Sequence, residues 1–99
     1  METNFTAFAQ NFKGGKFDGI NLRFSSPAGI FTSVFELNGE ALFCVSKEGS
    51  ASGRVFALRS FNETTLNEIC QFILAFEGSV AQLARSLKTK LVARPELDF

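Results

Sequence analysis

The chain carries few side chains suited to nucleophilic or metal chemistry. It has two cysteines, Cys44 and Cys70, and no histidine, so Ser-His and Cys-His pairs and histidine-based metal sites are excluded. The small-residue segment 49–53 lacks the Gly-Lys-Ser/Thr ending of a phosphate-binding loop. Glu36, Glu40 and Glu48 fall near expected strand ends and turns, where solvated acids are common. These residue types predict a non-enzymatic protein without a metal or cofactor.

Aromatic and basic residues alternate through the middle of the chain. Single-stranded nucleic acid is bound by aromatic platforms interleaved with cations. The candidates for such a surface are Arg23, Phe24, Phe31, Phe35, Arg54, Phe56, Arg59 and Phe61. The formal net charge is zero and Tyr and Trp are absent, which disfavours strong phosphate binding. Single-stranded nucleic acid is therefore the alternative partner, not the first.

A second group of cations lies towards the C-terminus. Residues 79–94 contain basic and no acidic side chains, whereas residues 62–78 contain acidic and no basic ones. The basic residues are Arg85, Lys88, Lys90 and Arg94. Acid at the start and base at the end suits the dipole of a helical region. Alternatively, these residues form a basic patch that meets phosphate or an acidic protein surface. The acidic tail then either folds back on this patch or serves as a short docking motif.

The elements that must position these residues begin with an antiparallel sheet. Apolar and polar residues alternate through the middle of the chain with the period of half-buried strands. The pattern predicts four strands in a meander: 20–24, 30–37, 40–47 and 54–60. Asn38-Gly39 should join the second and third strands, because a type I′ turn needs positive φ at both central residues. This turn pairs Val34 with Phe43, and the next hairpin is expected to pair Lys47 with Arg54.

Residues with helical periodicity precede and follow the predicted strands along the sequence. Phe5, Phe8 and Phe12 predict a short N-terminal helix, capped by Thr3 or Asn4 and ended by glycines 14 and 15. Residues 62–92 predict a second helical region, broken near Gly78 and restarted by Ser79 as an N-cap. Its expected apolar stripe comprises Leu66, Ile69, Cys70, Ile73 and Phe76, widened by Phe72 and Leu74.

The alternation divides the sheet into two faces. The core face comprises Ile30, Val34, Phe43, Val45, Phe56 and Leu58, and we expect the long helix to lie on it. The second face comprises Phe31, Phe35, Leu37, Leu42, Cys44, Val55 and Ala57, with Ser33 and Arg59. A solvated face should be polar, so this one should be covered. The possible covers are the N-terminal helix, the C-terminal segment, a second copy of the chain or another macromolecule.

The fold class is therefore α+β: a four-stranded antiparallel meander with a short N-terminal helix and a broken C-terminal helix on one face. We expect one domain over residues 1–99, with a helical arm at 1–15, the sheet at 19–61, the helical region at 62–92 and a tail at 93–99. The chain has no membrane span and no signal-peptide pattern, and its thiols are expected to be reduced. These features predict a cytoplasmic protein.

Two resemblances of element order bear on function. Four antiparallel strands followed by a helix resemble the order of Whirly and related coactivator-type single-strand binders. In size and element order the chain is also similar to several anti-CRISPR proteins, which implies a phage or mobile-element inhibitor of host machinery, acting in the host cytoplasm. Without a catalytic constellation, we expect a protein-binding module, with a homodimer possible. A structural subunit of a larger assembly is a further alternative.

If a protein binds the second face, its contacts should include aromatic and apolar anchors and a cation beside them. The candidate partner-binding residues are Phe31, Phe35, Leu42 and Arg59.

Overall fold

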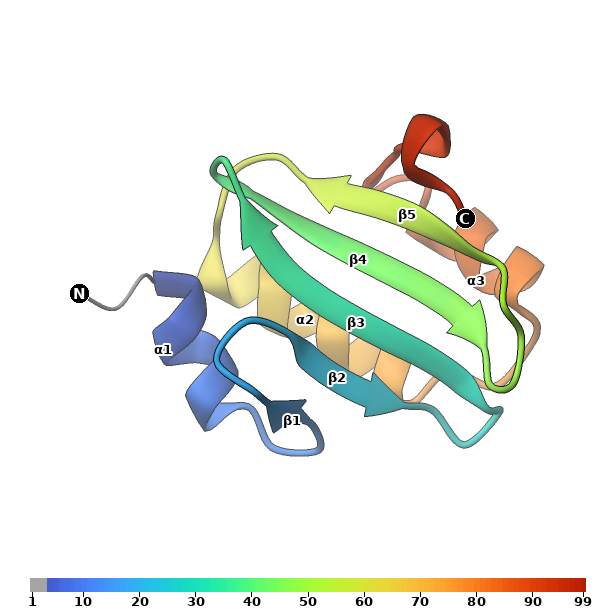
Figure 1. Ribbon diagram of the computed structural model, residues 1–99, viewed down its shortest axis with the longest axis horizontal. Helices are drawn as coiled ribbons and strands as arrows, with labels where there is room; N and C mark the ends of the chain where they lie inside the picture. Colours follow the sequence, from blue (N-terminus) through green and yellow to red (C-terminus); the bar gives the residue numbers. More distant parts are fainter. Residues whose placement is uncertain (1–3) are drawn as a thin grey trace.

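Each strand of the sheet pairs with its neighbour along the chain. The computed structural model describes residues 4–99, and within them the strands form one antiparallel sheet in the order β1-β2-β3-β4-β5-β6 (Figure 1). The strands are β1 (Lys16–Phe17), β2 (Leu22–Ser25), β3 (Ile30–Leu37), β4 (Glu40–Lys47), β5 (Gly53–Leu58) and β6 (Val92–Ala93). The prediction of four strands is therefore wrong, because it omits the two outermost strands, β1 and β6. β1 and β6 have two residues each, which is too short for a periodic pattern.

The helices complete an α+β architecture. They are α1 (Asn4–Asn11), α2 (Glu63–Leu74), α3 (Val80–Leu87) and the 3-10 turn η1 (Pro95–Leu97). Figure 1 shows α2 and α3 behind one face of the sheet and α1 at its β1 end. The expected cap Thr3 lies outside the described residues. No helix within residues 4–99 is long and apolar enough to cross a bilayer.

The turn between β3 and β4 has the predicted conformation. Asn38 has φ 52° and Gly39 has φ 81°, as a type I′ turn requires. Val34 accordingly pairs with Phe43. The register of this hairpin is confirmed.

The next hairpin, between β4 and β5, has a different register from the predicted one. Arg54 pairs with Val45 rather than with Lys47, and Phe56 pairs with Phe43. Side chains alternate between faces with a period of two, so this even shift leaves every residue of β5 on its expected face. The pairing was wrong, but the division into faces was right.

The core lies between the core face and the helices. Its sheet residues include Ile30, Val34, Phe43, Val45 and Phe56, all 0–3% exposed. Facing helices add the buried side chains Phe5, Phe8, Leu66, Ile69, Cys70, Ile73, Leu83 and Leu87. The predicted core face is confirmed. Thr32 is also fully buried there, and its hydroxyl has no hydrogen-bond partner among the described residues.

Three apolar residues depart from the predicted pattern. Leu37, expected on the covered second face, is 52% exposed at the end of β3. Ile20 is 71% exposed, because the chain at Asp18 forms a turn before β2 begins. The Asp18 carboxylate accepts hydrogen bonds from the backbone N–H groups of Ile20 and Asn21, at 2.9 and 2.7 Å, and holds this turn. Phe72 is 39% exposed on α2, so it does not widen the buried stripe.

The helical region is broken as predicted, but each helix ends earlier than expected. α2 ends at Leu74, before Phe76 and Gly78, and α3 ends at Leu87, so residues 88–92 are not helical. Asn62 caps α2 by accepting a hydrogen bond from the Thr65 N–H. Ser79 then caps α3 in a reciprocal capping box with Gln82. This restart places α3 behind the β4–β5 side of the sheet (Figure 1).

Candidate functional site

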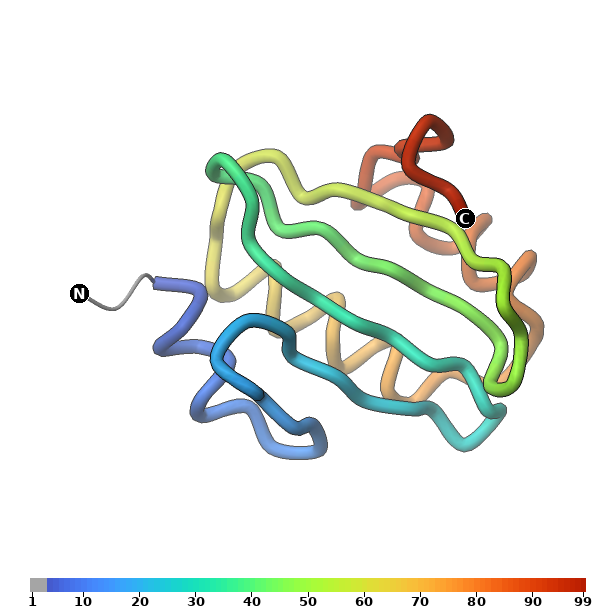
Figure 2. Tube along the Cα trace, in the orientation of Figure 1, coloured from blue at the N-terminus to red at the C-terminus, as the bar shows by residue number. Residues whose placement is uncertain are grey.

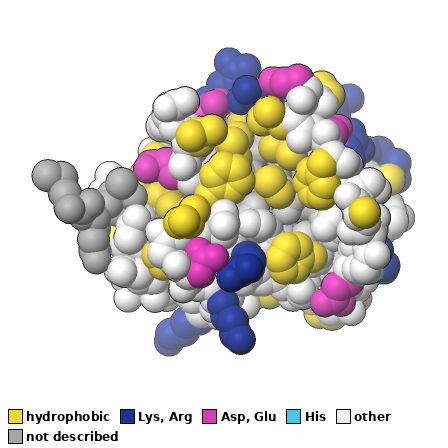
Figure 3. All heavy atoms as spheres, viewed as in Figure 1, with side chains coloured by type: hydrophobic (Ala, Val, Ile, Leu, Met, Phe, Trp, Pro, Cys, Tyr) yellow, Lys and Arg dark blue, Asp and Glu magenta, His cyan; other side chains and the backbone are white. Residues whose placement is uncertain are grey.

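The second face is apolar at its centre and only partly covered. Leu42, Val55 and Ala57 form a small buried cluster there, and Phe35 and Cys44 pack against it while remaining half-buried. Figure 3 views this side of the molecule and shows apolar side chains gathered across its middle, with charged side chains around them. This face is the candidate site.

The C-terminal segment supplies part of the cover. After β6 pairs with β5, the chain turns through η1 and returns to β5, where Phe99 and Gly53 exchange backbone hydrogen bonds of 2.9 and 3.2 Å (Figure 2). The Asp98 carboxylate accepts a hydrogen bond from the Val55 N–H at 2.9 Å. The tail therefore folds back, but onto β5 rather than onto the predicted basic patch, of which it meets only Arg94 through Glu96. Regular structure continues through η1.

The N-terminal helix does not cover the second face. Its phenylalanines Phe5 and Phe8 are buried in the main core, on the helix side of the sheet. The other half of the second face, over β2 and β3, therefore has no cover from the described residues, and Phe31, Ser33 and Phe35 are half-buried there.

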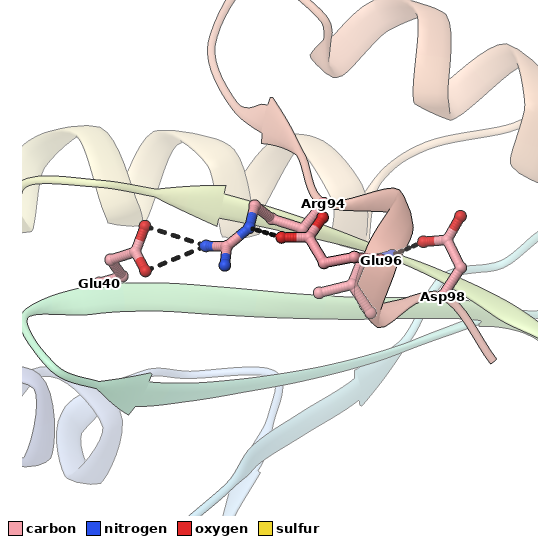
Figure 4. A network of polar contacts seen from close by, with 5 residues as sticks. Glu40, Arg94, Glu96 and Asp98 are labelled. Atoms are coloured by element: carbon pink, nitrogen blue, oxygen red, sulfur yellow. Dashed lines mark hydrogen bonds and ion pairs between the residues drawn. The ribbon is translucent and has the colours of Figure 1, made fainter.

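Ion pairs neutralise cations beside this face. The Arg94 side chain reaches past β5 to Glu40 on β4, at 3.0 and 3.2 Å, and also donates from Nε to Glu96 at 2.7 Å (Figure 4). These bonds raise the pKa of Arg94, and the bond from Arg94 lowers the pKa of Glu96. At the β1–β2 side, Arg23 pairs with Asp18 at 3.0 Å.

The structure brings the predicted partner-binding residues together only in part. Phe35 and Leu42 are direct cross-strand partners, but Leu42 is 3% exposed and lies under the surface. Phe31 lies further along β3 and is half-buried, and Arg59 is exposed just beyond the end of β5. Cys44, which the sequence placed on this face but not in the site, is half-buried beside Phe35. Alternation alone would have identified it.

The aromatic and basic residues proposed for nucleic-acid binding do not form one surface. Phe24 and Phe56 are 4% and 3% exposed and belong to the core, and the Arg54 guanidinium lies 5.9 Å from the Phe56 ring centroid on that same side. Phe31 and Phe35 lie on the second face. Neighbouring residues of a strand point to opposite sides, which divides the set.

The predicted basic patch is divided too. Arg85 and Lys88 line one pocket beside α3, together with Arg54. Lys90 instead lies 5.8 Å from the Phe72 ring centroid, and Arg94 is engaged with Glu40 and Glu96. The sequence named Arg54 as a candidate but did not group it with Arg85 and Lys88, because only the tertiary fold brings β5 beside α3.

Both cysteines are free. Cys70 is fully buried in the core, and burial raises the pKa of its thiol to about 12. Burial also raises the pKa of Cys44, which nevertheless keeps some exposure on the second face. Neither thiol resembles the activated nucleophile of a catalytic cysteine, whose pKa is depressed.

Within residues 4–99, no group of three or more Cys, Asp or Glu side chains is arranged to hold a metal ion. Comparison with known proteins adds no assignment: no family model, curated protein or solved structure matches the chain.

Proposed function

We propose that this domain is a non-enzymatic protein-binding module that docks a partner protein on the uncovered half of its second face. The observation that carries the proposal is the presence of two half-buried phenylalanines, Phe31 and Phe35, on the part of β3 that neither a helix nor the C-terminal segment covers. Aromatic side chains on a rigid sheet make strong anchors, because little conformational entropy is lost when they are buried by a partner.

The charges beside this face favour a protein over a nucleic acid. Binding to phosphates requires cations that are free to replace counterions. Arg23 and Arg94 are held by carboxylates, whereas Arg59 forms no ion pair among residues 4–99. A partner that presents an apolar patch, with a carboxylate near Arg59, matches this arrangement.

Leu42 has a supporting role in this proposal. It is buried beside Phe35, its cross-strand partner, so it holds the aromatic ring in position rather than meeting the partner protein. By occupying a functional surface of its partner, the module would act as an inhibitor, the role that its size and element order suggest.

The test compares two phenylalanine positions on different surfaces, the half-buried Phe35 and the exposed Phe72. The wild type, Phe35→Glu and, as a matched control, Phe72→Glu are used to capture proteins from cells that produce the chain, with nuclease present. We expect a nuclease-resistant protein that the wild type and Phe72→Glu capture and that Phe35→Glu loses. Thermal melts establish that each variant is folded. Capture that is equal for all three variants would contradict the proposed surface.

Cys44 provides an independent readout at the same surface. A partner on the second face should slow alkylation of Cys44, while Cys70 stays unreactive with or without it. Protection of Cys44 in the purified protein, together with a dimeric mass, would instead identify a second copy of the chain as the occupant.

A titration with a random single-stranded oligonucleotide tests the alternative. Binding at or below about 1 μM in physiological salt, lost in Arg54→Ala/Arg59→Ala, would place nucleic acid first. We expect no binding in this range, and Arg59→Ala should weaken capture of the protein partner only several-fold, since rim charges act mainly on the association rate.

A further inference from the structure

A separate pocket lies on the helix side of the sheet, between α3 and the β5–β6 edge. Its volume is about 480 Å³, within the range of small-molecule sites. The lining residues are Arg54, Phe56, Ala84, Arg85, Lys88, Leu91, Val92 and Ala93. Because Phe56 belongs to the core face, this pocket is separated by the sheet from the proposed docking surface.

The charged side chains of the pocket are all basic. Arg54 comes from β5, Arg85 lies in the last turn of α3, and Lys88 is the C-cap residue of that helix. Among residues 4–99, none of the three has a carboxylate within ion-pair distance. This contrasts with Arg94, whose guanidinium is satisfied by two glutamates. In a chain of zero net charge, three unpaired cations around one pocket are a local excess.

The floor of the pocket is apolar. Phe56, Ala84 and Leu91 are 3–8% exposed, so their visible surface faces the pocket rather than open solvent. Val92 adds a side chain that is 40% exposed. An inorganic anion would not cover the apolar floor, which would stay exposed to water, and a purely apolar ligand would not pair with the cations.

We propose that this pocket binds a small organic anion. Its acidic group, a carboxylate, sulfonate or phosphate, would be held by Arg54, Arg85 and Lys88, and its apolar body would lie on Phe56, Leu91 and Val92. Charge-assisted hydrogen bonds to guanidinium and ammonium groups are the strong ones in proteins, and an apolar floor strengthens them by excluding water. The proposal does not depend on the docking function.

The first test uses 1-anilinonaphthalene-8-sulfonate as the probe, which has an acidic group on an apolar body and fluoresces when it is sheltered from water. We expect Arg85→Ala/Lys88→Ala to weaken its binding by about tenfold, in line with the loss of charged hydrogen bonds. The matched control is Lys90→Ala, because Lys90 is a neighbouring cation outside the pocket. Phe35→Glu should also bind normally, which separates this site from the second face.

Two further measurements examine the ligand's chemistry. N-phenyl-1-naphthylamine, the analogue without the sulfonate, should bind much more weakly, and raising the ionic strength from about 0.1 M to about 1 M should weaken the sulfonate probe. Equal binding of both probes, or equal binding by wild type and Arg85→Ala/Lys88→Ala, would overturn the proposal.

Competition then distinguishes the sources of such an anion. Displacement of the sulfonate probe by decanoate would indicate an alkyl carboxylate, and displacement by adenosine monophosphate would indicate a nucleotide. Displacement by neither compound would overturn the assignment of an organic-anion site.

Discussion

Thr32 carries a hydroxyl that is buried in the core without a partner among residues 4–99. A buried polar group that forms no hydrogen bond destabilises the fold by its desolvation cost. Thr32→Val keeps the branched shape and removes this group, so it should raise the free energy of unfolding by about 1–2 kcal/mol. Urea unfolding measures the change.

The matched variant at this position is Thr32→Ser, which keeps the hydroxyl and removes a methyl group. It should lower stability by about 1 kcal/mol, the value of one buried methyl group. A destabilised Thr32→Val would show that the hydroxyl does form a stabilising hydrogen bond.

Asp18 links the stability of the β1–β2 turn to pH. Backbone N–H groups of Asn21 and Ile20 donate to its carboxylate, and with the Arg23 charge they lower the pKa of Asp18 in the folded chain. Unfolding therefore takes up a proton in the pH range between the folded and unfolded pKa values. The stabilisation is complete above about pH 4 and is lost as the pH falls through the folded pKa.

Asp18→Asn should accordingly flatten the fall in stability on the acid side. The measurement is urea unfolding at about pH 7 and about pH 3, which lie above and below the pKa of an aspartate in an unfolded chain. The control is Glu68→Gln, which alters an exposed carboxylate of α2 that forms no ion pair among residues 4–99. If Asp18→Asn and wild type have the same acid dependence, the turn does not hold the carboxylate in solution.

At the scale of elements, the β3–β4 hairpin depends on the backbone of its turn. Gly39 has φ 81°, and a Cβ added there would meet no described atom within 4 Å. The cost of a side chain is therefore conformational rather than steric crowding by neighbours. Gly39→Val should lower the free energy of unfolding by about 1–2 kcal/mol, because β-branched residues resist positive φ.

Gly39→Asn is the control for that experiment. Asparagine tolerates the left-handed region, so this variant should lose less than half as much stability as Gly39→Val. Thermal or urea denaturation of both variants gives the comparison. Equal losses of stability would mean that the presence of a side chain, and not the backbone conformation, causes the destabilisation.

At the scale of the whole molecule, the C-terminal segment packs against β5 and is held there by hydrogen bonds. Deletion of residues 95–99 removes the hydrogen bonds that Phe99 exchanges with Gly53 and the bond from Val55 to Asp98. The loss should be about 1–3 kcal/mol, because these contacts lie at an edge that water can partly satisfy.

Hydrogen exchange provides the local readout for this deletion. The amides of Gly53 and Val55 should lose protection beyond the global change in stability, whereas the Val34 and Phe43 amides at the β3–β4 pair should follow the global change only. Unaltered protection at Gly53 would show that the segment does not pair with β5 in solution.

Several features of this protein follow from the sequence alone, because neighbouring residues determine them. The Asn38-Gly39 turn requires positive φ at both positions, so it determined both the β3–β4 hairpin and its register. The Ser79–Gln82 capping box restarted the helix at the predicted place. Strand alternation then assigned the two faces correctly, even where the β4–β5 register was off by two positions.

Other features were decided only when distant segments met. β1 and β6 are strands because each lies beside an edge whose backbone needs partners, and two residues carry no periodicity of their own. The loop of residues 48–52 between β4 and β5, mostly small side chains, can close either register, so packing at Phe43 and Phe56 made the choice.

The candidate sites divide in the same way. The sequence identified Phe31 and Phe35 as members of an apolar face, because alternation is a local property. It could not show that the C-terminal segment covers the β5 half, nor that Arg54 joins Arg85 and Lys88 while Arg94 turns to Glu40. Those outcomes depend on contacts between residues far apart in the chain, whose geometry the packing of helices on the sheet determines.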